Sequence, residues 1–121
     1  MIDGYGGDNR KLNDKDIVLS FLNQLVADLG MRSLSDAQVF YAPGNNIKDP
    51  GGWSGFVVIQ ESHISIHTFP ARRFVSADVY TCQNNLDVKM ITDFIRDTFL
   101  LVDIESNFVV RGKQYPKKNI A

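Results

Sequence analysis

The spacing of apolar side chains along the chain predicts two helices. One face of the first is defined by apolar residues at every fourth position: Ile17, Phe21, Leu25 and Leu29. Asn13 is expected to cap the start of this helix, and Gly30 to end it. The second helix is predicted from Leu86 to Leu100, with a buried stripe that consists of Val88, Ile91, Ile95 and Phe99.

Shorter apolar or alternating segments predict strands. These segments are residues 38–41, 55–60, 63–69, 74–82 and 106–112. A polar loop rich in Gly, Pro and Asn spans residues 42–52. Because strands outnumber helices and short turns join some of them, we expect an α+β fold: a two-layer sandwich of an antiparallel sheet with two helices on one face.

Length and charge narrow the class of protein. The 121 residues are enough for a single domain, 1–121, with its own core. A formal net charge of -1 favours neither nucleic acid nor an anionic membrane as a partner, and no apolar segment is long enough to span a bilayer. The lone cysteine, Cys82, excludes an internal disulfide, and no apolar signal region precedes the first helix, so we expect a cytoplasmic protein.

Two neighbouring predicted strands carry both histidines and the cysteine. In the first strand His63, Ser65 and His67 alternate with isoleucines, so they share one face. The second strand places Ser76, Asp78, Tyr80 and Cys82 on a common face. If the two strands pair, these side chains converge on one side of the sheet. Such a face is usually only the wet side of a half-buried sheet, but this one gathers both histidines and the only cysteine.

Common catalytic motifs do not account for this face. No G-x-S-x-G turn accompanies the serines, and no acid is placed to orient a histidine. His63 and His67 stand four residues apart on a strand, which is a poor spacing for a shared metal, and no further Cys or His cluster supplements them. The glycines of residues 4–7 precede no Lys-Ser pair of a phosphate-binding loop. The residues alone therefore leave hydrolase and zinc chemistry weakly supported.

The segment QESHISIHTFP, residues 60–70, resembles the self-processing site of the S-adenosylmethionine decarboxylase family in its short bacterial and archaeal form. WSGFVV before it, ADVYTC after it and DGYGGD near the start also match, so the resemblance covers nearly the whole chain. It implies a proenzyme cut between Glu61 and Ser62 into residues 1–61 and 62–121. It also implies a pyruvoyl group made from Ser62 as the cofactor, without metal or pyridoxal phosphate.

The resemblance gives the processing and catalytic residues their roles. Ser62 would attack the carbonyl of Glu61, and elimination would then cut the chain. The pyruvoyl carbonyl would form a Schiff base with the substrate's amine and act as an electron sink when carbon dioxide departs. Ser54 and His67 match residues that assist processing, although without the resemblance Ser54 would be interpreted as a turn residue. Cys82 matches the residue that protonates the product carbon.

Three positions depart from the family pattern. Ala71 stands where the family has a glutamate that binds the ribose hydroxyls, and alanine cannot accept their hydrogen bonds. Lys48 falls where a phenylalanine stacks on adenine, a contact worth about 0.5–1.5 kcal/mol beyond area burial. Gly7 replaces a cysteine, and only Met1 and Ile2 precede the matched opening segment. We therefore expect the family's first strand to be very short or absent.

The retained chemistry and the replaced nucleoside contacts favour a changed substrate, a basic amino acid such as arginine or ornithine. Asp49 would hold its cationic end, although an Asp before Pro50 is more often a turn former. One alternative is decarboxylation of S-adenosylmethionine itself, and either substrate leads toward polyamines. A second alternative is an unprocessed, non-catalytic homologue that acts as a binding partner.

The resemblance implies a homodimer of processed protomers with active sites shared across the interface. The partner of the site itself would be a small molecule of the amino-acid type. We assign His63, which follows the scissile bond, a structural or positioning role.

Overall fold

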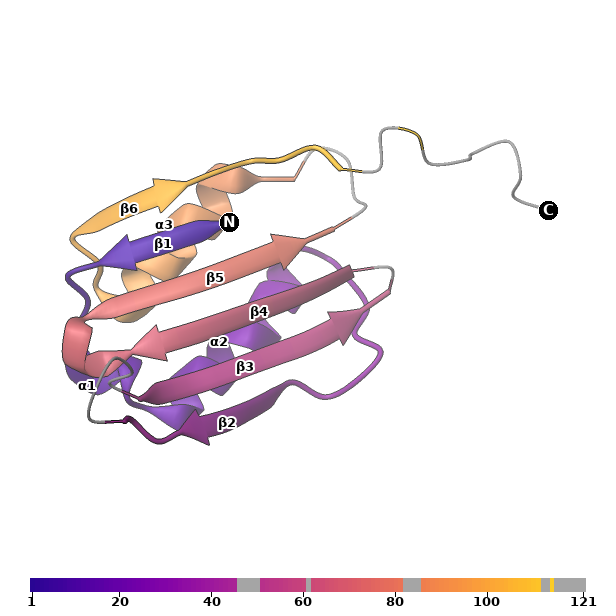
Figure 1. Ribbon diagram of the computed structural model, residues 1–121. Helices are drawn as coiled ribbons and strands as arrows, with labels where there is room; N and C mark the ends of the chain where they lie inside the picture. The colour runs from indigo at the N-terminus through magenta and orange to yellow at the C-terminus, as the bar shows by residue number, and fades with distance from the viewer. Residues whose placement is uncertain (46–50, 61, 82–85, 112–113, 115–121) are drawn as a thin grey trace.

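A computed structural model describes residues 1–45, 51–60, 62–81, 86–111 and 114 (Figure 1). Its strands form one antiparallel sheet in the order β2-β3-β4-β5-β1-β6. The strands are β1 (Ile2–Tyr5), β2 (Gln38–Ala42), β3 (Gly52–Ile59), β4 (Ser62–Phe69), β5 (Phe74–Tyr80) and β6 (Asp103–Ser106). The helices are α1 (Asn9–Leu12), α2 (Lys15–Asp28), α3 (Val88–Phe99) and the short 3-10 helix η1 (Pro70–Arg72).

Helices α2 and α3 cover one face of the sheet and leave the other face open (Figure 1). The core lies between the two layers, where Ile64 and Ile66 of β4 meet Phe21 and Leu25 of α2 in one buried cluster. Burying each such side chain contributes about 1.5–3 kcal/mol. The predicted α+β sandwich with an antiparallel sheet and two helices on one face is thereby confirmed.

Helix boundaries follow the capping side chains. Asp14, rather than the predicted Asn13, caps α2, because its carboxylate accepts the backbone N–H groups of Asp16 at 2.9 Å and Ile17 at 3.2 Å. Gly30 follows the helix with a φ of +66°, as a helix-terminating glycine should. The sequence pattern missed α1, because four residues are too few to show a helical period.

The ends of the chain show where the strand predictions fail. The predicted strand over 106–112 is wrong, since β6 ends at Ser106. Its only partner among the described strands is β1. The pairing between the two strands ends at the pair Ile2–Ser106. β1 itself has four residues, which agrees with the expectation of a very short first strand.

The second predicted helix is also shorter than expected. α3 begins at Val88, which is 37% exposed, so its predicted place in the buried stripe is wrong. Ile91, Ile95 and Phe99 are buried as predicted. No helix in the described part of the chain combines the length and the apolar character needed to cross a membrane.

Candidate active site

A hydrogen-bonded serine and histidine lie on the open face of the sheet. Ser54 of β3 and His67 of β4 are directly opposite each other in the antiparallel ladder, and Ser54 Oγ lies 2.8 Å from His67 Nδ1. Alternation turns both side chains away from the helices, while Gly55 and Ile66, the next pair along, face the core. The structure thus brings together two of the residues expected to assist processing.

Backbone packing beside this pair fixes the relative position of the two strands. The hydroxyl of Thr68, a buried residue, accepts the backbone N–H of Trp53 at 3.1 Å. Gly52 lies so close to the Thr68 carbonyl that a Cβ there would overlap the oxygen. Trp53 adjoins Ser54 in the chain, and Thr68 adjoins His67. These contacts therefore keep Ser54 opposite His67 in the ladder.

Ser62 is the first residue of β4. It pairs with Ile59, so residues 60 and 61 alone connect β3 to β4. The Gln60 N–H donates to the Arg32 carbonyl at 3.0 Å, which anchors the start of the turn. Ser62 is half-buried, and alternation places its side chain on the same face as Ile64.

Ser62 and the Ser54–His67 pair do not meet within one chain. His67 lies five residues beyond Ser62 on the same strand, which corresponds to about 17 Å at 3.3–3.4 Å per residue. An odd separation along a strand also puts the two side chains on opposite faces of the sheet. The predicted site residues therefore divide into two groups at different places in the fold. Glu61, Cys82, Lys48 and Asp49 lie outside the described residues.

His63 belongs to a stacked arrangement near Ser62. Its ring stacks on Tyr80 of β5 with centroids 5.1 Å apart and an interplanar angle of 20°. The Arg111 guanidinium lies over the same Tyr80 ring at 4.6 Å. These contacts agree with the structural or positioning role expected for His63. Strand alternation predicted that Tyr80 lies on the same face as His63, which the pairing of the two residues confirms, but nothing in the sequence pattern brings residue 111 to this strand.

Acidic side chains surround Tyr5 on the open face beyond β5. A hydrogen bond to the Glu105 carboxylate raises the pKa of Tyr5 above its usual value, and partial burial and the charges of Asp3 and Asp103 act in the same direction. Tyr5 is therefore a neutral hydroxyl at physiological pH. The described residues contain no group of three His, Cys, Asp or Glu side chains arranged to hold a metal.

The segment after β4 carries no acid. Ala71 is exposed within η1, and Arg73 follows in the left-handed region with a φ of 54°. The side chain that the family pattern would use for the ribose hydroxyls is thus absent from position 71.

Comparison with known proteins adds independent evidence. The family model described as S-adenosylmethionine decarboxylase matches residues 1–112. An S-adenosylmethionine decarboxylase proenzyme of Pyrobaculum aerophilum is 37% identical over 91 residues, which cover 75% of this chain and 68% of that protein. Proenzyme 2 of Halalkalibacterium halodurans is 34% identical over 108 residues, covering 89% and 80% of the two chains.

A more distant relative matches more of the chain, and a solved structure shares the fold. The Clostridium botulinum proenzyme is 27% identical over 114 residues, covering 93% of this chain and 91% of its own. The crystal structure of the Aquifex aeolicus adenosylmethionine decarboxylase aligns with a TM-score of 0.70 and 24% identity, over 93% of this chain and 91% of that one. This structural likeness supports the fold.

Proposed function

The chain belongs to the S-adenosylmethionine decarboxylase family, and on this premise we propose that it is a self-processing proenzyme that decarboxylates S-adenosylmethionine. The observation that carries the proposal is the 2.8 Å contact between Ser54 and His67 on the open face of a sheet whose next strand begins with Ser62. The curated relatives are named for S-adenosylmethionine, which favours this substrate over the basic amino acid expected from Ala71 and Lys48.

Processing would begin at the turn between β3 and β4. Ser62 Oγ attacks the carbonyl carbon of Glu61, the amide nitrogen leaves, and an ester joins the two residues. Loss of the Ser62 α-proton then breaks its Cβ–Oγ bond and releases the Glu61 carboxylate, which leaves fragments 1–61 and 62–121. The dehydroalanine left at position 62 tautomerises to an imine, and hydrolysis by water releases ammonia and gives the pyruvoyl group. With His67 Nδ1 engaged by Ser54, the ring's Nε2 is available to carry a proton in these steps.

Ser62 suits the role of precursor to the pyruvoyl group. It stands first in β4, half-buried beside a two-residue turn, and ladder pairing of His63 with Val58 would keep the new end in place after cleavage. The group supplies an electrophilic carbonyl that takes the substrate's amine and accepts the electrons left when carbon dioxide departs. Cys82 is proposed, on its sequence match, to return a proton to the product carbon.

The separation of Ser62 from His67 supports a shared site. Because the two residues lie about 17 Å apart along β4 and on opposite faces, the Ser54–His67 pair is proposed to serve Ser62 of a second copy of the chain. The open face supports such a partner. Phe40, Phe56 and Val58 are 56%, 37% and 39% exposed there, and the Phe40 and Phe56 rings stack. A two-fold dimer through this face would cover these apolar side chains.

The experiment that tests the function has two readouts on the purified protein. Intact-mass measurement should show two fragments divided at Glu61–Ser62, and carbon dioxide should be released from S-adenosylmethionine faster than from arginine or ornithine. Ser62→Ala is the matched control, and this variant should neither be cut into two fragments nor release carbon dioxide. A single chain that resists carbonyl reagents would instead support a non-catalytic homologue. Turnover of arginine or ornithine in preference to S-adenosylmethionine would support the changed substrate.

A further inference from the structure

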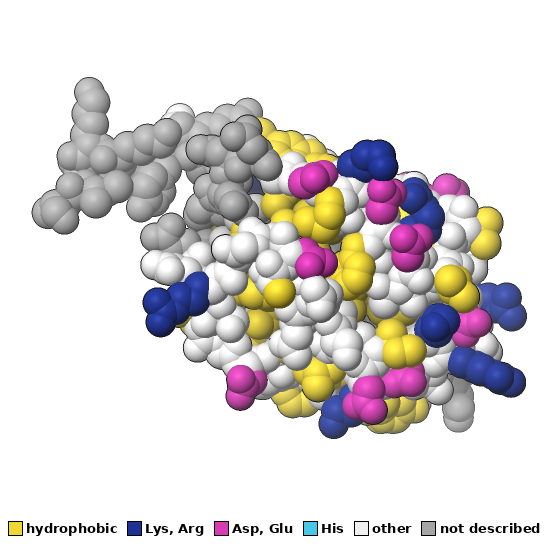
Figure 2. All heavy atoms as spheres, turned by 180° about the vertical axis from the view of Figure 1, so that it is seen from behind, with side chains coloured by type: hydrophobic (Ala, Val, Ile, Leu, Met, Phe, Trp, Pro, Cys, Tyr) yellow, Lys and Arg dark blue, Asp and Glu magenta, His cyan; other side chains and the backbone are white. Residues whose placement is uncertain are grey.

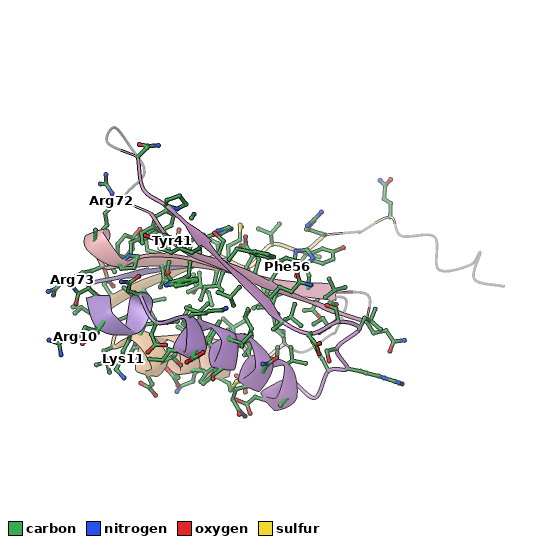
Figure 3. The ribbon with its side chains drawn as sticks, turned by 90° about the horizontal axis from the view of Figure 1, so that it is seen from below. Arg10, Lys11, Tyr41, Phe56, Arg72 and Arg73 are labelled. Carbon is green, nitrogen blue, oxygen red and sulfur yellow. The ribbon has the colours of Figure 1, made fainter. Side chains whose placement is uncertain are left out.

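Four basic side chains gather at one end of the molecule. Arg72, Arg73, Arg10 and Lys11 follow one another along the end where η1 meets α1 (Figure 3). The two segments pack against each other, and the Gly7 N–H donates to the Arg73 carbonyl at 3.0 Å. Residues far apart in the sequence therefore form one contiguous basic corner, defined here as these four side chains.

The basic corner is not neutralised by ion pairs within the described structure. The ion pairs found there both involve Asp93 of α3, with Lys89 and Arg96 as its partners. The acid nearest in sequence, Asp8, offsets one of these positive charges; its Oδ1 accepts the backbone N–H groups of Arg10 and Lys11 at 2.9 and 3.1 Å. A surplus of positive charge thus remains on a chain whose formal net charge is -1.

Backbone hydrogen bonds fix the arginines of η1 in place. The Arg73 N–H donates to the Pro70 carbonyl at 3.1 Å, and its own carbonyl accepts from Gly7. Both arginine side chains are exposed at this turn. An arginine guanidinium offers a planar set of donors that matches two oxygens of one phosphate, so two consecutive arginines with two further cations suit a ligand that carries several phosphates.

We propose that the basic corner binds a small multivalent phosphate anion, namely a pyrophosphate or triphosphate group, either inorganic or as part of a nucleotide. The corner offers fewer cations than the roughly 6–10 phosphate contacts of a protein whose binding to nucleic acid is steeply salt-dependent, so a short phosphate chain fits it better. The surface seen from behind carries Lys and Arg interspersed with Asp and Glu, so it does not extend the corner into a basic track (Figure 2). This binding is independent of the decarboxylase proposal.

The test titrates the full-length protein with sodium pyrophosphate, with inorganic triphosphate, with ATP and with adenosine, and follows backbone amide shifts by NMR. Pyrophosphate and ATP should give saturable shifts at Arg10, Lys11, Arg72 and Arg73, and adenosine should give none. Raising the salt should weaken the binding, since screening shortens electrostatic interactions between exposed charges to about 8 Å at 0.15 M. Equal affinity for inorganic triphosphate and ATP would assign the site to the phosphate chain alone, whereas tighter binding of ATP than of inorganic triphosphate would assign it to nucleotides.

Matched variants keep the test specific. The double variant Arg72→Gln/Arg73→Gln should bind pyrophosphate about tenfold or more weakly, because two charge-assisted contacts are lost. Arg32→Gln removes an exposed cation beside the turn at Gln60, away from the corner, and should bind like the wild type. Absence of saturable shifts, an equal loss in both variants, or much tighter, length-dependent binding of a single-stranded oligonucleotide would overturn the proposal.

Discussion

Ser62 and His67 occupy the same strand, five residues apart, with side chains on opposite faces of the sheet. His67 is hydrogen-bonded to Ser54 across the ladder, while Ser62 stands at the far end of β4 beside the turn. A single chain therefore holds the processing pair and the scissile bond at different places. The proposed function joins them only when two copies come together.

Replacing Ser62 by alanine should abolish cleavage, because the hydroxyl that attacks Glu61 is lost. The purified Ser62→Ala protein is expected to be a single full-length chain by intact mass. Ser65→Ala is the matched control, since Ser65 lies on the same strand but faces the other side, and it should be cut normally. Fragments in the Ser62→Ala sample would show that another residue starts the reaction.

Replacing either partner of the 2.8 Å contact should slow processing. His67→Gln is expected to lower the rate of cleavage about 10²–10⁴-fold, the range for a lost proton-transfer group, and Ser54→Ala should also slow it. The rate is followed by mass as freshly folded protein matures. His63→Phe retains a ring to stack on Tyr80 and should process at a near-normal rate. Equal rates of cleavage in His63→Phe and His67→Gln would show that His67 is not the proton-transfer group in processing.

Cys82→Ala should separate self-cleavage of the chain from decarboxylation of the substrate. Without the thiol the chain should still be cut at Glu61–Ser62, but decarboxylation should fall about 10²–10⁴-fold if Cys82 protonates the product carbon. Intact mass and carbon dioxide release, measured on the same sample, distinguish the two effects. Normal turnover by the processed variant would exclude Cys82 as the proton donor.

The core between β4 and the helices should dominate stability. Ile66 is fully buried, so Ile66→Ala should lower the free energy of unfolding by about 2–5 kcal/mol. Val110 is 59% exposed beyond β6, and Val110→Ala should change the free energy of unfolding by at most about 0.5 kcal/mol. Urea unfolding of an uncleaved Ser62→Ala background measures both. Equal effects would contradict the placement of Ile66 in the core.

Hydrophobic periodicity was enough to predict the layers of the fold, because α2 and α3 each carry a repeated apolar stripe and β4 alternates cleanly. The four residues of α1 are too few for a pattern. The strand predicted over 106–112 failed because the length of β6 is set by its short partner β1, which lies at the other end of the sequence.

The site was predictable in its residues but not in its geometry. The resemblance assigned roles to Ser54 and His67, yet their contact depends on the register of β3 with β4, which the sequence does not specify. The predicted strand began at His63, so the opposite faces of Ser62 and His67 follow only from the observed bounds of β4. The stack of Arg111 on Tyr80 depends on the path of the chain after β6, for which the sequence gives no pattern.

A test of cleavage between chains addresses the shared site most directly. A Ser62→Ala chain keeps the Ser54–His67 pair but has no serine to cut, whereas a His67→Ala chain keeps Ser62 but lacks the histidine. The two are co-expressed with different tags, mixed dimers are isolated through both tags, and the masses of all fragments are measured. We predict that the His67→Ala chain is cut at Glu61–Ser62 in the mixed dimer, while each variant expressed alone stays full length. A His67→Ala chain that remains intact in the mixed dimer would contradict the account.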